Sequence, residues 1–244
     1  MIKIENIDVV GWEAAVRGMR NPMNSWKKSD SKFYRDPTIG CCGPCPCMDI
    51  EDDCECYFVG FDDLNLMMKL RNAGTDHRKF MRMITVYMDI TAPLYWWKEF
   101  DTYKVGTVAN SCSTMHKITD KELTLDDFSC EHLMTSGMDI LMRTIKNLND
   151  CRNAYAKYAE WNNYGFKKPT QKDIWWQMIQ LLPSSYNQRR TVMLNYEVLA
   201  NMYDSRKNHK LDEWADFCKR ITTLPYSELI TGLGLLPIEE DLYG

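Results

Sequence analysis

The segment from Met138 to Trp161 repeats apolar residues at helical spacing over several turns. These apolar positions are Ile140, Leu141, Ile145, Leu148, Tyr155 and Tyr158. A helix with one apolar face must bury that face against another element, so this segment predicts a long helix in a layered fold. Apolar residues recur three and four positions apart elsewhere, which predicts further helices at 62–73, 92–102, 173–182, 189–205 and 212–221.

Two other segments favour strands. Ile2 to Val10 alternates partly between apolar and polar residues, and Phe80 to Thr91 contains the run MITVYMDIT, which includes β-branched residues. Helices that outnumber strands in this way predict an α+β fold. A chain of 244 residues is long enough for one sizeable core, so we expect a single domain over 1–244. The Pro-, Gly- and Cys-rich composition of 37–57 predicts an irregular insertion in that domain.

The charge balance of the chain excludes several classes of protein. Its net charge of −4 implies no broad basic surface, so we expect no nucleic-acid partner. No apolar run approaches the roughly 18 residues of a membrane span, and we expect no membrane partner. The first residues, MIKIENIDVV, lack the basic-then-apolar order of a signal peptide. We therefore expect a cytoplasmic protein whose ten cysteines are mostly thiols.

Cysteines cluster between positions 41 and 56. They are Cys41, Cys42, Cys45, Cys47, Cys54 and Cys56. The pairs Cys42/Cys45 and Cys54/Cys56 offer four thiolates, a ligand set that zinc favours. Only one residue separates the second pair, and neighbouring acidic residues would add negative charge to an anionic site. Zinc binding, disulfide formation and an exposed loop of free thiols all stay open.

The stretch YKVGTVANSCSTMH, from Tyr103 to His116, consists mainly of small and polar residues. We predict a ligand-facing loop over 106–114, in which Gly106 permits close approach of the backbone. Its hydroxyls and its amide suit a phosphate or a pyrimidine, and they belong to Thr107, Asn110, Ser111, Ser113 and Thr114. A polar turn without a ligand is the alternative, and Cys112 would act as a nucleophile only beside a base or a cation.

The predicted helix over 189–205 carries a cation near its end. Leu199, Met202 and Arg206 lie three and four positions apart and share a face, and Asn195 lies three turns earlier on nearly the same line. A guanidinium group is a rigid, always charged fork of donors for carbonyl and phosphate oxygens. Two interpretations stay open: Arg206 faces a ligand pocket, or it is a C-terminal cation favoured by the helix dipole.

With these segments the chain resembles a flavin-dependent thymidylate synthase. The resemblance covers LNLMMKLRNAGTDHRKFMR (Leu64 to Arg82), MDITAPLYWWKEF (Met88 to Phe100), ANSCSTM (Ala109 to Met115) and LLPSSYNQRRTVMLNYEVLANMYDSRKN (Leu181 to Asn208). The third segment resembles the latter part of the family signature, which typically reads Asn-Glu-x-Ser-x-Arg-Tyr. The resemblance implies a homotetramer of subunits with a mixed sheet and several long helices, in which the subunits share their active sites.

The resemblance also implies an activity: flavin-dependent C5 methyl or other one-carbon transfer to deoxyuridine monophosphate. FAD would be the cofactor, with NADPH and methylenetetrahydrofolate as co-substrates. It implies that Arg206 binds the pyrimidine and polarises it, as the catalytic residue. The predicted substrate-binding residues are Asn110, Ser111, Ser113 and Arg206. The predicted cofactor-binding residues are Arg82, Tyr103, Lys104, Asn195 and Asn201. We expect the Ser113 turn and Arg206 to converge on one cavity, within or across protomers.

The chain departs from the family signature at several cationic positions. Thr102-Tyr103-Lys104 stands where the signature has Arg-His-Arg, Met115 replaces an arginine, and Glu197 replaces a flavin-side arginine. Three functions therefore stay open. The first is the flavin-dependent enzyme, and the second is a non-catalytic protein that sequesters or senses a nucleotide. The third is an interaction protein whose cysteine-rich segment contacts a partner.

Overall fold

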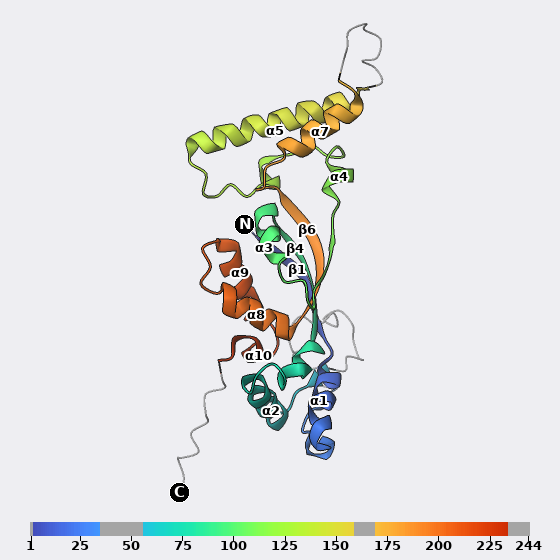
Figure 1. Cartoon of the computed structure of the whole chain (residues 1–244), viewed down its shortest axis with the longest axis vertical. Coiled ribbons are helices and arrows are strands. Elements are labelled where there is room, and N and C mark those ends of the chain that lie inside the picture. Colours follow the sequence, from blue (N-terminus) through green and yellow to red (C-terminus); the bar gives the residue numbers. More distant parts are fainter. Residues whose placement is uncertain (1, 35–55, 159–168, 234–244) are drawn as a thin grey trace. The chain divides into compact units, whose positions relative to one another are not determined.

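The protein is described by a computed structural model that covers residues 2–34, 56–158 and 169–233 (Figure 1). A four-stranded sheet has the order β1-β4-β6-β5. Its strands are β1 (Lys3–Val10), β4 (Thr85–Pro93), β5 (Val108–Ser111) and β6 (Asn187–Asn195). A second sheet pairs β2 (Lys32–Tyr34) with β3 (Cys56–Phe58) in antiparallel register. Sheet and helices occur together, which confirms the predicted α+β class.

The chain divides into two compact units. Unit 1 comprises residues 1–3, 90–102 and 110–190, and unit 2 comprises 4–89, 103–109 and 191–244. The boundary between the units falls within β1, β4, β5 and β6. The single domain over 1–244 stays a prediction.

Unit 1 is built around two helices. The predicted long helix is confirmed as α5 (Thr135–Ala156), and α7 (Gln171–Leu181) packs along it (Figure 1). Leu141, Ile145 and Leu148 of α5 form a buried cluster with Met178 of α7. The remaining elements of unit 1 are α3 (Leu94–Phe100), α4 (Thr114–Lys117) and the 3-10 turn η5 (Leu125–Asp127). The helix predicted over 92–102 is thus shorter, with Pro93 as the residue before its first turn.

Unit 2 holds the remaining helices of the described chain. Its helices are α1 (Trp12–Arg20), α2 (Phe61–Asn72), α8 (Tyr196–Arg206), α9 (Asp212–Ile221) and α10 (Glu228–Thr231). Its 3-10 turns are η1 (Asn21–Met23), η2 (Trp26–Lys28) and η4 (Arg78–Arg82). α8 contacts α9, α10 and η4. Because η4 occupies 78–82, the strand predicted from Phe80 begins only at Thr85.

The prediction of one helix over 189–205 is wrong in its first part. Residues 187–195 form β6, and the helix α8 begins at Tyr196. Within β6, Val192 and Leu194 are buried while Arg189 and Thr191 are exposed, which is the alternation of a strand with one buried face. Arg189 and Arg190 therefore lie on a strand and not on a helix.

The predicted loop over 106–114 is also corrected. Residues 108–111 form β5, a strand that pairs with β6 at one end of the sheet. All four residues of β5 are exposed, so its sequence carries no apolar alternation that would have indicated a strand.

Two expectations concern the whole chain. Among the described residues, no helix is long and apolar enough to span a membrane. The cysteines from Cys41 to Cys54 lie outside the described residues. The zinc site considered for this cluster therefore stays untested. Of the described cysteines, Cys112, Cys130, Cys151 and Cys218 are free thiols.

Candidate functional site

Two aromatic rings hold the guanidinium group of Arg206, the last residue of α8. The Nε of Arg206 donates a hydrogen bond of 2.9 Å to the hydroxyl of Tyr103. The guanidinium carbon lies 5.6 Å from the centre of the Tyr103 ring and 4.9 Å from that of Trp214. Cation–π attraction and this hydrogen bond together restrict a long, flexible side chain to one orientation. A charged fork held in this way suits the binding of a carbonyl or phosphate oxygen.

The segment that carries Tyr103 passes directly over the start of α8. Gly106 has a φ of +80°, and a Cβ placed there would lie 2.9 Å from Nδ2 of Asn195 and 3.0 Å from Cγ2 of Val198. Asn195 caps α8, since its Oδ1 accepts a hydrogen bond of 3.0 Å from the backbone N–H of Val198. The segment 103–106 thus lies along α8, with Tyr103 at Arg206 and Gly106 at Asn195. Lys104 lies in the same segment and is exposed.

Arg82 and Asn201 meet in a different group, through Arg78 and Glu197. Arg82 makes a bidentate pair with the carboxylate of Glu197, in which Nη2 lies 3.2 Å from Oε1. The Nε of Arg78 lies 3.4 Å from the same Oε1, and its Nη2 donates a hydrogen bond of 3.2 Å to Asn201. The hydrogen bond to Glu197 raises the pKa of Arg82. A carboxylate of the chain therefore offsets part of the positive charge of this group.

The predicted substrate-binding residues other than Arg206 belong to unit 1. Asn110 and Ser111 are exposed on β5. Ser113 caps α4, because its Oγ accepts a hydrogen bond of 3.3 Å from the backbone N–H of His116. Since Ser113 belongs to unit 1 and Arg206 to unit 2, their convergence on one cavity stays a prediction.

Neither Trp214 nor Arg78 is among the residues that the sequence marks as functional. Trp214 lies on α9 and is completely buried, so its helical spacing marks it as a core residue. Arg78 is one of several basic residues in the polar run TDHRK, and nothing there distinguishes it. Trp214 lies on the helix that follows α8, whereas Arg78 emerges only because the fold brings η4, distant in sequence, against α8.

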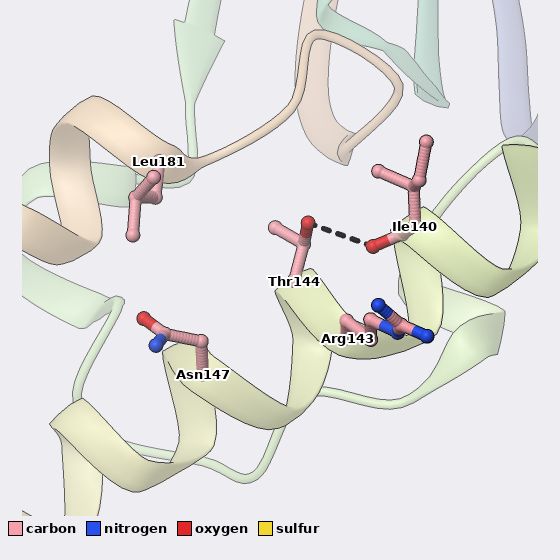
Figure 2. A pocket seen from close by; sticks show the side chains of 5 residues that line it. All are labelled: Ile140, Arg143, Thr144, Asn147 and Leu181. Atoms are coloured by element: carbon pink, nitrogen blue, oxygen red, sulfur yellow. Dashed lines mark hydrogen bonds between the residues drawn. The ribbon is translucent and has the colours of Figure 1, made fainter.

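A pocket of about 270 Å³ lies in unit 1, and Figure 2 shows the side chains that line it. Ile140, Arg143, Thr144 and Asn147 come from α5, and Leu181 comes from the end of α7. The hydroxyl of Thr144 is turned to its own helix, where it donates a hydrogen bond of 2.9 Å to the carbonyl of Ile140 (Figure 2). None of the predicted site residues lines this pocket.

The fold is similar to that of known enzymes. No protein-family model and no curated protein matches the sequence. Two solved structures of thymidylate synthase X from Helicobacter pylori, each described with FAD and dUMP, match nearly the whole chain. The first has a TM-score of 0.59 and 13% identity and covers 94% of this chain and 96% of its own. The second has a TM-score of 0.58 and 14% identity and covers 92% and 96%. This chain therefore has the fold of a flavin-dependent thymidylate synthase subunit.

Proposed function

We propose that this protein binds a pyrimidine deoxynucleoside monophosphate and, with a flavin, transfers a methyl or other one-carbon group to C5 of the base. The observation that carries the proposal is the fold match, which extends over 94% of the chain to an enzyme described with FAD and dUMP. The resemblance of the sequence segments supports it separately, because it rests on residue types and their spacing rather than on the path of the backbone. NADPH and methylenetetrahydrofolate are the co-substrates that this activity requires.

Arg206 is the residue we propose to bind and polarise the pyrimidine. Its guanidinium group is a rigid fork of donors, and the rings of Tyr103 and Trp214 hold it in place. A preorganised cation stabilises negative charge that develops on a carbonyl oxygen as C5 reacts. Ser113, Asn110 and Ser111 are the proposed further contacts to the nucleotide.

We propose the segment 103–106, which lies along α8, for the ring system of a flavin. Tyr103 offers an aromatic face, and Asn195 offers an amide beside the close approach at Gly106. A flavin bound there would supply the hydride for the one-carbon transfer. Arg82 is poorly suited to bind the diphosphate of FAD, because Glu197 already forms an ion pair with this arginine. Lys104 is then the exposed cation that we propose for the phosphates.

A second candidate function follows from the pair formed by Arg82 and Glu197. In this chain other residues replace several cofactor-binding cations of the family, and Glu197 neutralises Arg82. Such a chain can keep a nucleotide site and lose the ability to bind a flavin. Such a protein would sequester or sense a pyrimidine nucleotide without chemistry. Colour separates the two functions, since only the flavin-dependent enzyme purifies yellow or takes up added FAD.

Calorimetric titration with dUMP tests the shared claim of nucleotide binding. We expect the purified protein to bind dUMP, and Arg206→Ala to weaken binding roughly tenfold to a hundredfold, the effect of losing a hydrogen bond to a charged group. Arg220→Ala, at an exposed arginine in the last turn of α9, is the matched control and should leave the affinity unchanged. Absence of dUMP binding in the native protein would contradict both functions, and an unchanged affinity of Arg206→Ala would contradict its role.

A further inference from the structure

The side-chain amide of Gln188, on β6, uses both of its ends. Its Nε2 donates a hydrogen bond of 2.9 Å to the carbonyl of Cys112 and one of 3.1 Å to the hydroxyl oxygen of Thr114. Its Oε1 accepts a hydrogen bond of 3.0 Å from Nε of Arg190. Only one orientation of the amide satisfies all three contacts, because the nitrogen must face two acceptors and the oxygen must face a guanidinium donor.

A second layer of contacts fixes this amide from behind. Nη1 of Arg190 donates a hydrogen bond of 2.8 Å to Asp101, and the guanidinium carbon lies 4.2 Å from the centre of the Trp97 ring. The indole N–H of Trp97 donates a hydrogen bond of 2.9 Å to the backbone carbonyl of Gln188. Trp97 is completely buried, so this support is rigid. Gln188 thus connects a fixed part of unit 1 to the turn at 112–114.

These contacts determine which hydrogen bonds the hydroxyls of Ser113 and Thr114 can still make to a ligand. The oxygen of Thr114 accepts from Gln188, and that of Ser113 accepts from the backbone N–H of His116. In the described part of the chain, no acceptor is found for the proton of either hydroxyl. Each hydroxyl remains a donor, and accepting a hydrogen bond makes it a stronger one.

We propose that Ser113 and Thr114 donate these two protons to the phosphate of the nucleotide, and that Gln188 is the positioning residue that orients Thr114. This inference rests on the proposed function, and it names a nucleotide contact, Thr114, and a positioning residue, Gln188, in addition to those given above. A phosphate suits two adjacent donors because it offers several acceptor oxygens in different directions, whereas a pyrimidine carbonyl offers one.

Titrations with dUMP and with deoxyuridine, which lacks the phosphate, test this inference. Thr114→Val should weaken dUMP binding roughly tenfold and leave deoxyuridine binding unchanged, whereas Thr114→Ser should retain the affinity for dUMP. Gln188→Met removes the amide at similar length and should weaken dUMP binding severalfold. Gln177→Met, at an exposed glutamine of α7, is the matched control. In the double variant the two losses should not add, because both act through one hydroxyl.

Hydrogen exchange without any ligand separates this inference from the proposed function. If Gln188 positions the turn, Gln188→Met should speed amide exchange at 112–117 and leave α5 unchanged. Unchanged exchange would overturn the positioning role whether or not the protein binds dUMP. Equal losses for dUMP and deoxyuridine in Thr114→Val would overturn the phosphate contact while nucleotide binding itself stands. A native protein that binds neither ligand would overturn the proposed function and, with it, the phosphate contact.

Discussion

At the scale of single residues, Glu197 controls the charge that a ligand meets near Arg82. We expect Glu197→Gln to tighten binding of FAD by roughly tenfold, because the amide leaves the charges of Arg78 and Arg82 uncompensated. Binding of riboflavin, which carries no phosphate, should stay the same. Fluorescence titration of each flavin measures the two affinities. An equal change for both flavins would show that Glu197 acts on the ring or on the fold and not on the diphosphate.

Asp63 makes stability depend on pH. It is completely buried on α2, where Arg20 and Ser29 each donate to its carboxylate at 2.6 Å. Burial raises the pKa of this carboxyl, but the hydrogen bonds from Ser29, Ser31 and Arg20 outweigh that effect and hold it below its ordinary value of 3.8. Because the unfolded chain takes up this proton at a higher pH than the folded chain, the stability that Asp63 contributes is present above 3.8 and is lost as the pH falls through the lower folded pKa.

Asp63→Asn should therefore lower the free energy of unfolding at neutral pH by about 3–5 kcal/mol, the usual effect of leaving a buried ionic partner uncompensated. It should also flatten the dependence of stability on acid pH. Urea denaturation at a series of pH values measures both effects, and Asp62→Asn, at the exposed neighbouring residue, serves as control. A variant with the same acid dependence as the native protein would exclude Asp63 as the source.

At the scale of elements, the close approach at Gly106 holds the Tyr103 segment against α8. We expect Gly106→Ala to cost about 1–2 kcal/mol from the left-handed backbone alone, and more from the contacts with Asn195 and Val198. Gly74→Ala isolates the backbone effect, since Gly74 has a φ of +113° but open space around its Cβ position. Chemical denaturation compares the two variants. Equal losses would mean that the contact with α8 contributes nothing.

The elements differ in how far their sequences predict them. Helices such as α5, α7 and α9 are predictable because one apolar face repeats along each of them. β6 resembles a helix in sequence because the apolar residues of RTVMLN continue into those of α8 without a break. β5 resembles a loop because all of its residues are exposed. The pairing of Arg82 with Glu197 has no sequence signal, since the two lie far apart in the chain and only the packing of η4 on α8 joins them.

At the scale of the whole molecule, we propose the homotetramer that the family resemblance implies, and exposed apolar side chains on and next to α5 and α7 support it. They are Met134, Ile140, Met142, Trp176 and Leu181, with exposed fractions from 42% to 80%. Of these, Ile140 and Leu181 line one pocket, and adjoining exposed apolar residues are typical of a surface that another subunit covers. The proposed occupant is a second copy of this chain.

Light scattering after gel filtration should accordingly give a mass near four chains for the native protein. Ile140→Asp places a charge on this surface and should reduce the mass to that of a smaller species, since a buried unpaired carboxylate opposes association. Asn153→Asp, an exposed position on another side of the same helix, should keep the native mass. A native protein that elutes as one chain would contradict the tetramer.

Asn195 is both the last residue of β6 and the cap of α8, so no linker separates the strand from the helix. An insertion or deletion at this junction would turn every side chain of α8 by about 100° about the helix axis, because a helix completes a turn in about 3.6 residues. Arg206 would then leave the rings that hold it. Homologous chains can thus vary in length within their connecting segments. A working relative should keep the same number of residues between the buried positions of β6 and the arginine that ends α8.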